Sequence, residues 1–218
     1  EILGIFGLVG AGRNELLRLI YGATPRTGGR ILVGTDEALI NAPRDAIRAG
    51  VVLCPEDRKK EGIIPVRSVL ENLNLSARRR TARAGIFIDE AWERRNADER
   101  IAELRVRTPS AQALIRTLSG GNQQKVILGR WLSWKLRVLL LDEPTRGIDV
   151  GAKAEIYRLI QKLASEGMGI ILISSENEEV LQLSHRILVL RNGHIMEERT
   201  GGELELEEAM SIAAGGTT

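Results

Sequence analysis

The 218-residue sequence contains one cysteine, few aromatic residues and no long apolar segment. Because Cys54 stands alone, an internal disulfide is excluded, and the composition fits a reducing compartment. No apolar run approaches the roughly 18 residues that a membrane-spanning helix needs, and no signal-peptide pattern opens the sequence. Any role at a membrane is therefore expected to come through a partner. The formal net charge of only +2 gives no indication of a nucleic-acid partner.

Three smaller features also lack the pattern of a binding site. Cys54 ends an apolar run and is expected to be buried and inert. His185 and His194 are isolated and do not have metal-ligand spacing, so we interpret them as ordinary residues. Arg78–Arg80 and Arg83 form a basic cluster without interleaved aromatic residues, which we interpret as a solvated helix face and not as an RNA or lipid contact.

The chain alternates short β-rich runs with helical stretches, which is typical of an α/β fold with a mostly parallel sheet covered by helices. Apolar runs such as VLLL and IILI indicate strands buried on both faces. The stretch of about residues 56–133 is rich in Arg, Glu and Ala, and we predict a helical subdomain there. It would be inserted into a core of about residues 1–55 and 134–218, within a single domain. Since an apolar strand follows Glu1 at once, we expect a fragment of a longer subunit.

The individual elements are predicted from these runs. The predicted strands are Ile2–Leu8, Arg30–Val33, Val51–Cys54, Val138–Leu141, Gly169–Ile173, Arg186–Leu190 and His194–Glu198. The predicted helices are Arg13–Tyr21, Arg44–Ala49, Gly121–Leu132, Ala152–Ser165, Glu178–Leu183 and a short one from about Glu203, before a frayed GGTT end.

A glycine-rich segment, GLVGAGRN at residues 7–14, follows the first predicted strand and has the spacing of the phosphate-binding P-loop, G-x-x-x-x-G-K-[ST]. Such glycines let backbone N–H groups and the helix N-terminus face phosphate oxygens. Arg13 stands at the lysine position that reaches the β- and γ-phosphates, and Asn14 at the hydroxyl position that ligates Mg²⁺. Arg13 keeps the charge in a bulkier planar head, and Asn14 offers a carbonyl oxygen of different reach. Alone, the segment is equally consistent with a glycine-rich turn that binds nothing.

A second segment, LSGGNQQK at residues 118–125, matches the signature of ATP-binding cassette (ABC) ATPases. A serine and two glycines before a helix make another anion-binding helix N-terminus. The simpler alternative is that Ser119 only caps the helix. In the family, this segment faces the γ-phosphate of a nucleotide held by the opposite domain.

A third segment, VLLLDEPT at residues 138–145, matches the Walker B strand. Its apolar run buries the strand and delivers Asp142 to the carboxyl end of the sheet, where such folds bind ligands. The resemblance implies that Asp142 orients Mg²⁺ and that Glu143 positions or deprotonates the attacking water. Asp149 then lies in the D-loop, which touches the other domain. An acidic pair in a solvated turn is the alternative, and the order of the motifs argues against it.

These motifs run from Gly7 to about Glu179 in the ABC order, so nearly the whole chain resembles an ABC nucleotide-binding domain of the P-loop NTPase class. Two further positions depart from the family pattern: Glu56 replaces the Q-loop glutamine and Ser175 the switch histidine. Such departures are similar to the second, C-terminal cassette of monosaccharide importers, whose ATPase subunit carries two fused cassettes. PEDRKKEG at residues 55–62 and TRGIDVG at 145–151 also match that cassette. The segments LCPEDRKKEGIIPV, NLSARRR and LGRWLS resemble most closely the ATPase of arabinose importers.

The resemblance implies ATP and Mg²⁺ as cofactors, with little hydrolysis at this chain's own P-loop. It implies three partners: a second nucleotide-binding cassette, transmembrane permease subunits and, indirectly, a periplasmic sugar-binding protein, at the cytoplasmic face of the inner membrane. The residues it predicts to bind nucleotide are Gly7, Gly10, Ala11, Gly12, Arg13, Asn14, Glu15, Ser119, Gly120, Gly121, Gln123 and Asp149. The predicted catalytic positions are Glu143, Ser175 and Glu56, and the predicted metal ligands are Asp142 and Asn14.

Two other functions share part of this pattern. A regulatory module that binds nucleotide without hydrolysing it would keep the same loops. A DNA-repair ATPase would share the signature and Walker B segments but needs a long coiled-coil insertion, which this sequence lacks.

Overall fold

The computed structural model describes residues 1–82, 84 and 86–216 and divides into two compact units. The core unit comprises Glu1–Leu53, Leu136–Arg146 and Ile160–Thr218, and the helical unit comprises Cys54–Lys135 and Gly147–Leu159. Arg83 and the last two residues of the expected frayed end lie outside the described residues.

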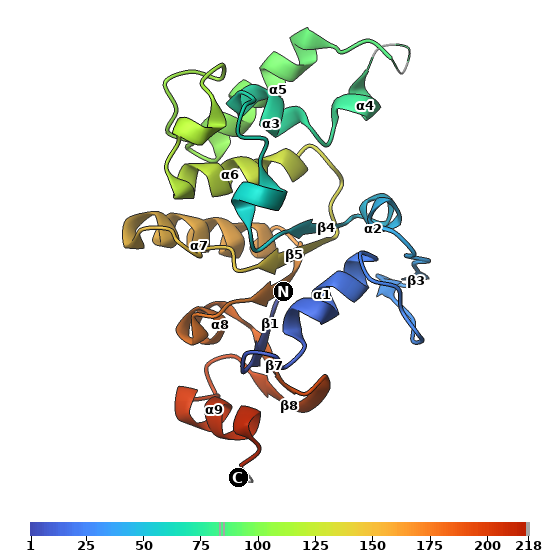
Figure 1. Cartoon of the computed structure of the whole chain (residues 1–218), viewed down its shortest axis with the longest axis vertical. Coiled ribbons are helices and arrows are strands. Elements are labelled where there is room, and N and C mark those ends of the chain that lie inside the picture. Colours follow the sequence, from blue (N-terminus) through green and yellow to red (C-terminus); the bar gives the residue numbers. More distant parts are fainter. Residues whose placement is uncertain (83, 85, 217–218) are drawn as a thin grey trace. The chain divides into compact units, whose positions relative to one another are not determined.

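The described part of the core unit contains a six-stranded sheet in the order β4-β5-β6-β1-β7-β8 (Figure 1). Strand β1 pairs in parallel with β6 and β7, β5 pairs in parallel with β6, and β8 is antiparallel to β7. The predicted α/β fold with a mostly parallel sheet is therefore confirmed. Its strands are β1 (Ile2–Gly7), β4 (Val51–Cys54), β5 (Val138–Asp142), β6 (Gly169–Ile173), β7 (Arg186–Arg191) and β8 (His194–Thr200).

Helices cover both faces of this sheet because successive residues of a strand point to opposite sides. Ile5 packs in one cluster with Leu17 of the first helix, whereas its neighbour Phe6 packs in another with Val180 and Ile212. The helices of this unit are α1 (Arg13–Tyr21), α2 (Pro43–Ala49), α8 (Asn177–Leu183) and α9 (Leu206–Ala214), and α7 (Val150–Ser165) is shared with the helical unit.

The predicted elements of the core are all present, with ends within two residues of the prediction except for the last helix, which begins at Leu206. One element was missed, the short strand β3 (Asp36–Glu37), which pairs with β2 (Leu32–Val33). Aspartate and glutamate disfavour strands, so the sequence carries little signal for it.

The helical unit is organised around α6 (Gly120–Trp131), which packs against α3 (Val69–Asn74). Gly129 allows this contact, since a Cβ there would lie 3.0 Å from Leu73 Cδ2 and 2.6 Å from Leu104 Cδ1. The other elements are a π-helical turn (Arg58–Gly62), α4 (Arg78–Thr81), α5 (Glu90–Glu103) and a 3₁₀ turn (Ile115–Thr117).

A buried asparagine ties three parts of the helical unit together. Asn72 is 1% exposed, and its Oδ1 accepts a hydrogen bond from the backbone N–H of Ile64 at 2.9 Å. Its Nδ2 donates to the carbonyls of Ile64 and Ser68, at 3.1 and 2.9 Å. From α6, Arg130 Nε donates to the carbonyl of Asn72 at 2.8 Å and Nη2 to Oδ1 at 3.3 Å. One side chain thus pairs both the N–H and the carbonyl of Ile64, which lies outside any helix or strand.

The described part of the basic cluster is largely solvated, as the sequence suggested, since Arg79 and Arg80 are exposed, but two of its arginines also make contacts within their own unit. Arg78 forms a bidentate ion pair with the buried carboxylate of Glu93, at 2.7 and 3.0 Å. Arg80 lies over the ring of Trp134, 4.3 Å from its centre, and donates to the carbonyl of Ser133. These arginines have roles in packing because α4 lies against neighbouring elements of its own unit.

Cys54 is buried as predicted, and burial raises the pKa of its thiol to about 12, against the opposing charge of Arg130. The pKa of this thiol is therefore higher in the folded state than in the unfolded chain. The unfolded chain loses its thiol proton first, so the free energy of unfolding is unaffected by this group below about pH 9 and falls as the pH rises toward 12.

We therefore expect the free energy of unfolding to fall by about 1 kcal/mol more in the wild type than in Cys54→Ala between about pH 8 and pH 10. Urea unfolding of both proteins at each pH measures the difference. Equal pH dependence in the two proteins would contradict the buried neutral thiol.

No helix among the described residues is both long enough and apolar enough to cross a bilayer.

Candidate functional site

The P-loop segment joins the end of β1 to the start of α1, at the carboxyl edge of the sheet. Gly10 and Gly12 have φ angles of 83° and 98°, in the left-handed region that favours glycine. Gly12 caps α1 without any side-chain hydrogen bond to the helix. The N-terminal N–H groups of α1 are therefore presented without a side-chain cap, as in an anion-binding helix N-terminus.

Arg13 lies beneath this loop with its side chain directed inward. It is 8% exposed, and its Nη1 donates to the carbonyl of Ser174 at 2.9 Å, just beyond the end of β6. Burial lowers the pKa of this guanidinium, and the nearby charges of Glu143 and Asp142 oppose the shift. The positive charge therefore compensates the acidic pair of the Walker B segment.

Asn14 contacts the first of these acids. Its Nδ2 donates to both carboxylate oxygens of Asp142, at 3.1 and 3.3 Å. The sequence predicted a carbonyl oxygen here for Mg²⁺, but the amide nitrogen faces Asp142, because an amide oxygen would repel the carboxylate. The described residues contain no group of three or more acidic, His or Cys side chains placed to hold a metal. The Asp142 carboxylate is a ligand of the kind that Mg²⁺ takes together with phosphates and water, whereas Asn14 presents a donor nitrogen on this side and not a ligand.

Glu143 and Ser175 meet across the ends of β5 and β6. Ser175 Oγ donates to Glu143 Oε2 at 2.8 Å. Glu143 also has a φ of 51°, a conformation that is strained for residues other than glycine and that concentrates at functional sites. The one donor that Ser175 offers in place of the switch histidine is thus engaged with the acid that the family uses on the attacking water.

The core unit brings together most of the predicted P-loop and Walker B positions, all near the carboxyl ends of β1, β5 and β6. These positions are Gly7, Gly10, Ala11, Gly12, Arg13, Asn14, Glu15, Asp142, Glu143 and Ser175. Glu56, Ser119, Gly120, Gly121, Gln123 and Asp149 belong to the helical unit.

In the helical unit, Ser119 occupies the N-cap position of α6 but does not bond to the helix backbone. Asn122 Nδ2 donates to Ser119 Oγ at 2.9 Å instead. The alternative that Ser119 is only a helix cap is therefore not what the structure shows. Gly121 is required for packing, since a Cβ there would lie 2.6 Å from Ala152 Cβ at the start of α7.

Gln123 differs from its predicted role in nucleotide binding. It is 6% exposed, and its Nε2 donates to the carbonyl of Leu118 at 3.0 Å. Four residues beyond Ser119 on α6, it lies on the inner face of the helix. Asn122 was not predicted, although a polar residue three positions after a serine N-cap is a recognisable signal for such a contact.

Arg58 was also missed as a neighbour of the signature. Its Nη2 donates to the carbonyl of Gly147 at 3.1 Å. The same Nη2 lies beside Gly120, and a Cβ added to that glycine would be only 2.7 Å from it. It thus links the PEDRKKEG segment to both the signature and the predicted D-loop, Gly147–Asp149. In the core unit, Thr145 Oγ1 donates to the buried carboxylate of Glu179, whose pKa burial raises.

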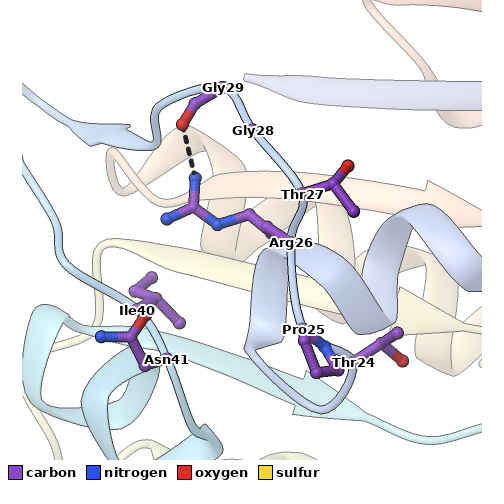
Figure 2. A pocket seen from close by; sticks show the side chains of 8 residues that line it. All are labelled: Thr24, Pro25, Arg26, Thr27, Gly28, Gly29, Ile40 and Asn41. Atoms are coloured by element: carbon purple, nitrogen blue, oxygen red, sulfur yellow. Dashed lines mark hydrogen bonds between the residues drawn. The ribbon is translucent and has the colours of Figure 1, made fainter.

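A separate hollow of about 340 Å³ in the core unit is lined by residues 24–29, 40 and 41 (Figure 2). Arg26 is turned back toward its own loop there, and its Nη1 donates to the carbonyl of Gly29 at 3.0 Å. None of the predicted site residues lines this hollow.

Known protein families and structures share the motifs described above. The profile of the ABC transporter family matches residues 1–146, which include the P-loop, the signature and the Walker B strand. The chain belongs to the ABC transporter family.

Curated relatives of this ABC cassette are similar over almost its full length. It is 54% identical over 213 residues to the arabinose import ATP-binding protein AraG of Pectobacterium atrosepticum, covering 98% of this chain and 42% of that protein. It is 57% identical to AraG of Pseudomonas fluorescens, with 98% and 41% covered. The predicted resemblance to arabinose-importer ATPases is confirmed, and the chain spans less than half the length of these relatives.

Solved structures confirm the fold. The cassette MJ0796, in a dimeric post-hydrolysis state bound to ADP and Pi, is similar with a TM-score of 0.74 at 22% identity, covering 94% of this chain and 87% of that one. CbiO1 of Clostridium perfringens, part of an ABC transporter complex, is similar with a TM-score of 0.76 at 21% identity, covering 93% and 78%.

Proposed function

We propose that this cassette serves a monosaccharide importer, with arabinose as the first candidate sugar, and completes the ATP site of a second cassette. This proposal is supported by a contrast between the signature segment and the P-loop segment of the chain. The signature presents Ser119 at an uncapped helix N-terminus, whereas the acidic residues beside the P-loop are engaged by the chain's own side chains. The names of the relatives support arabinose import.

In the composite site, this chain would act on the terminal phosphate of a nucleotide held by the partner's P-loop. Because Ser119 Oγ accepts from Asn122, its own proton remains available for a phosphate oxygen. The uncapped N–H groups of α6 and its helix dipole would add further stabilisation. Each donor to developing phosphate charge is worth about 10²- to 10³-fold in rate.

At the chain's own P-loop we propose nucleotide binding with little hydrolysis. Arg13 donates to Ser174, Asn14 to Asp142 and Ser175 to Glu143, so three of the four replaced side chains have a named partner within the protein. Such losses combine non-additively, because the groups act as a unit. We place the Mg²⁺ of the composite site with the partner cassette's P-loop.

The other partners follow from the importer assignment. We propose that the cassette lies at the cytoplasmic face of the inner membrane, bound to transmembrane permease subunits, and that a periplasmic sugar-binding protein acts through them. The Glu56–Glu61 segment, rich in charge and aligned with the Q-loop, is the proposed permease-facing surface.

A regulatory cassette that binds nucleotide and never contributes to hydrolysis is the second candidate, favoured by the internal bonds of Arg13 and Asn14. Binding of ATP and ADP to this chain, compared with turnover of the two-cassette subunit, separates the two. A regulatory cassette predicts that changes in its signature leave turnover intact.

The proposal is tested by phosphate release. We expect this chain alone to hydrolyse ATP at less than about one-tenth of the rate of the intact two-cassette subunit, since at least one catalytic donor is lost. Arg94→Met on the exposed face of α5 is the control for the intact subunit and should leave its rate unchanged. Hydrolysis by this chain alone at the rate of the intact subunit would refute the assignment.

A further inference from the structure

A small polar pocket adjoins the signature within the helical unit. Its volume is about 190 Å³, and its lining consists of Arg107, Ser119, Gly121, Asn122, Asp149, Gly151, Ala152 and Glu155. It therefore contains the signature serine, the D-loop aspartate and one arginine that neither motif includes. Arg107 comes from the segment between α5 and the 3₁₀ turn, and its side chain is 81% exposed.

Asn122 joins this arginine to the signature. Its Nδ2 donates to Ser119 Oγ at 2.9 Å, while its Oδ1 accepts from the backbone N–H of Arg107 at 2.8 Å. A single amide therefore holds the serine hydroxyl and the backbone of Arg107 in one arrangement. Because Ser119 Oγ accepts a hydrogen bond from the Asn122 amide, its hydroxyl proton can be donated to another acceptor.

The charges around the pocket balance, since Arg107 and Lys125 are positive and Glu155 and Asp149 are negative, but the close partner of Glu155 is Lys125 and not Arg107. Glu155 Oε2 accepts from Lys125 Nζ at 2.6 Å, and this ammonium is 5% exposed. Arg107 Nη2 reaches the other oxygen, Glu155 Oε1, at only 3.4 Å, in an exposed pair of the kind that is worth little. Lys125 thus already compensates Glu155. Asp149 caps the start of α7, because its Oδ1 accepts a hydrogen bond from the backbone N–H of Ala152 at 3.0 Å.

We propose that Arg107 binds the phosphates of the nucleotide held by the partner cassette, next to Ser119, and that Asn122 is the positioning residue for both. The ligand class is a nucleoside triphosphate, recognised by a guanidinium and a hydroxyl on one wall of the pocket. This inference rests on the proposed function, because the phosphates come from the second cassette.

The test measures ATP hydrolysis by the intact two-cassette subunit as a function of ATP concentration. Arg107→Met is expected to raise KM about 5- to 10-fold with kcat within about twofold, because a contact made in both ground and transition states changes KM alone. Arg107→Lys keeps the charge and should stay within about threefold of wild type, while Arg107→Glu should exceed the effect of Met. Raising the salt concentration should weaken binding in the wild type more than in Arg107→Met.

Asn122→Ala provides the second arm. Loss of the amide leaves Ser119 without a fixed orientation, so kcat should fall about tenfold, within the range for a misplaced donor. Arg94→Met, an exposed arginine of the same unit paired only on its own helix, is the matched control and should behave as wild type.

The outcomes separate this inference from the proposed function. If Ser119→Arg abolishes turnover but Arg107→Met and Arg107→Glu leave KM within twofold, the inference is overturned and the proposed function stands. If Ser119→Arg leaves turnover unchanged, the proposed function itself fails. An Arg107→Lys variant as impaired as Arg107→Met, with kcat lowered in both, would show a structural role and also overturn the inference.

Discussion

Ser119→Arg in the intact two-cassette subunit is expected to lower ATP turnover by more than about 100-fold, the cost of removing one donor from a charge-stabilising site. The change removes the hydroxyl that Asn122 contacts and puts a long side chain where we propose that the partner's phosphate binds. Ser119 has φ and ψ of −61° and 157°, an extended conformation that arginine adopts freely, and it is exposed. The fold should therefore be retained. Phosphate release at saturating ATP is the measurement.

Ser165→Arg is the matched control for this variant. It adds the same side chain at an exposed position at the end of α7, where a positive charge is tolerated by the helix dipole. Its turnover should equal that of the wild type. A Ser119→Arg subunit that keeps half or more of the activity would show that this signature does not serve a catalytic site.

Asn72→Ala is expected to destabilise the chain by about 3 kcal/mol, a shift of more than about 100-fold in the folding equilibrium. The substitution leaves the part-buried N–H of Ile64 without its acceptor and removes one of the two bonds that the buried Arg130 makes to this residue. Each buried group left unpaired costs about 1–3 kcal/mol. Urea unfolding followed by circular dichroism measures the loss, and the midpoint of thermal unfolding should fall by roughly 6–12 °C.

Asn41→Ala serves as the control, since this asparagine is exposed and its side chain lies at the rim of the hollow in Figure 2. Its change in stability should stay within about 0.5 kcal/mol. A loss below about 1 kcal/mol for Asn72→Ala would mean that water or a local rearrangement replaces the bonds of the asparagine.

The fold was predictable because its main signals are local. Buried strands such as Val138–Asp142 read as continuous apolar runs, and the start of α1 at Arg13 follows directly from the glycine pattern. The motif spacing also identified which residues gather at the ends of the strands. The network around Asn72 was not predictable, because Arg130 lies 58 residues away and no periodicity links the two.

The directions of side chains in the site were the main part that the sequence did not show. Whether Arg13 faces a ligand or the carbonyl of Ser174 depends on how β6 lies against β1, which is a tertiary contact. The same holds for the Asn14 amide, whose orientation is fixed by the Asp142 carboxylate. Motifs specify positions along the chain, whereas hydrogen-bond partners across the sheet specify what each position can do.

The inward-turned Arg13 also bears on the ligand-free protein. A positive charge close to two carboxylates favours their ionised forms. Here Asp142 and Glu143 have a permanent counterion in the guanidinium beneath them. The compensating charge of this acidic pair is therefore built into the polypeptide itself, and does not have to be supplied by a bound ion.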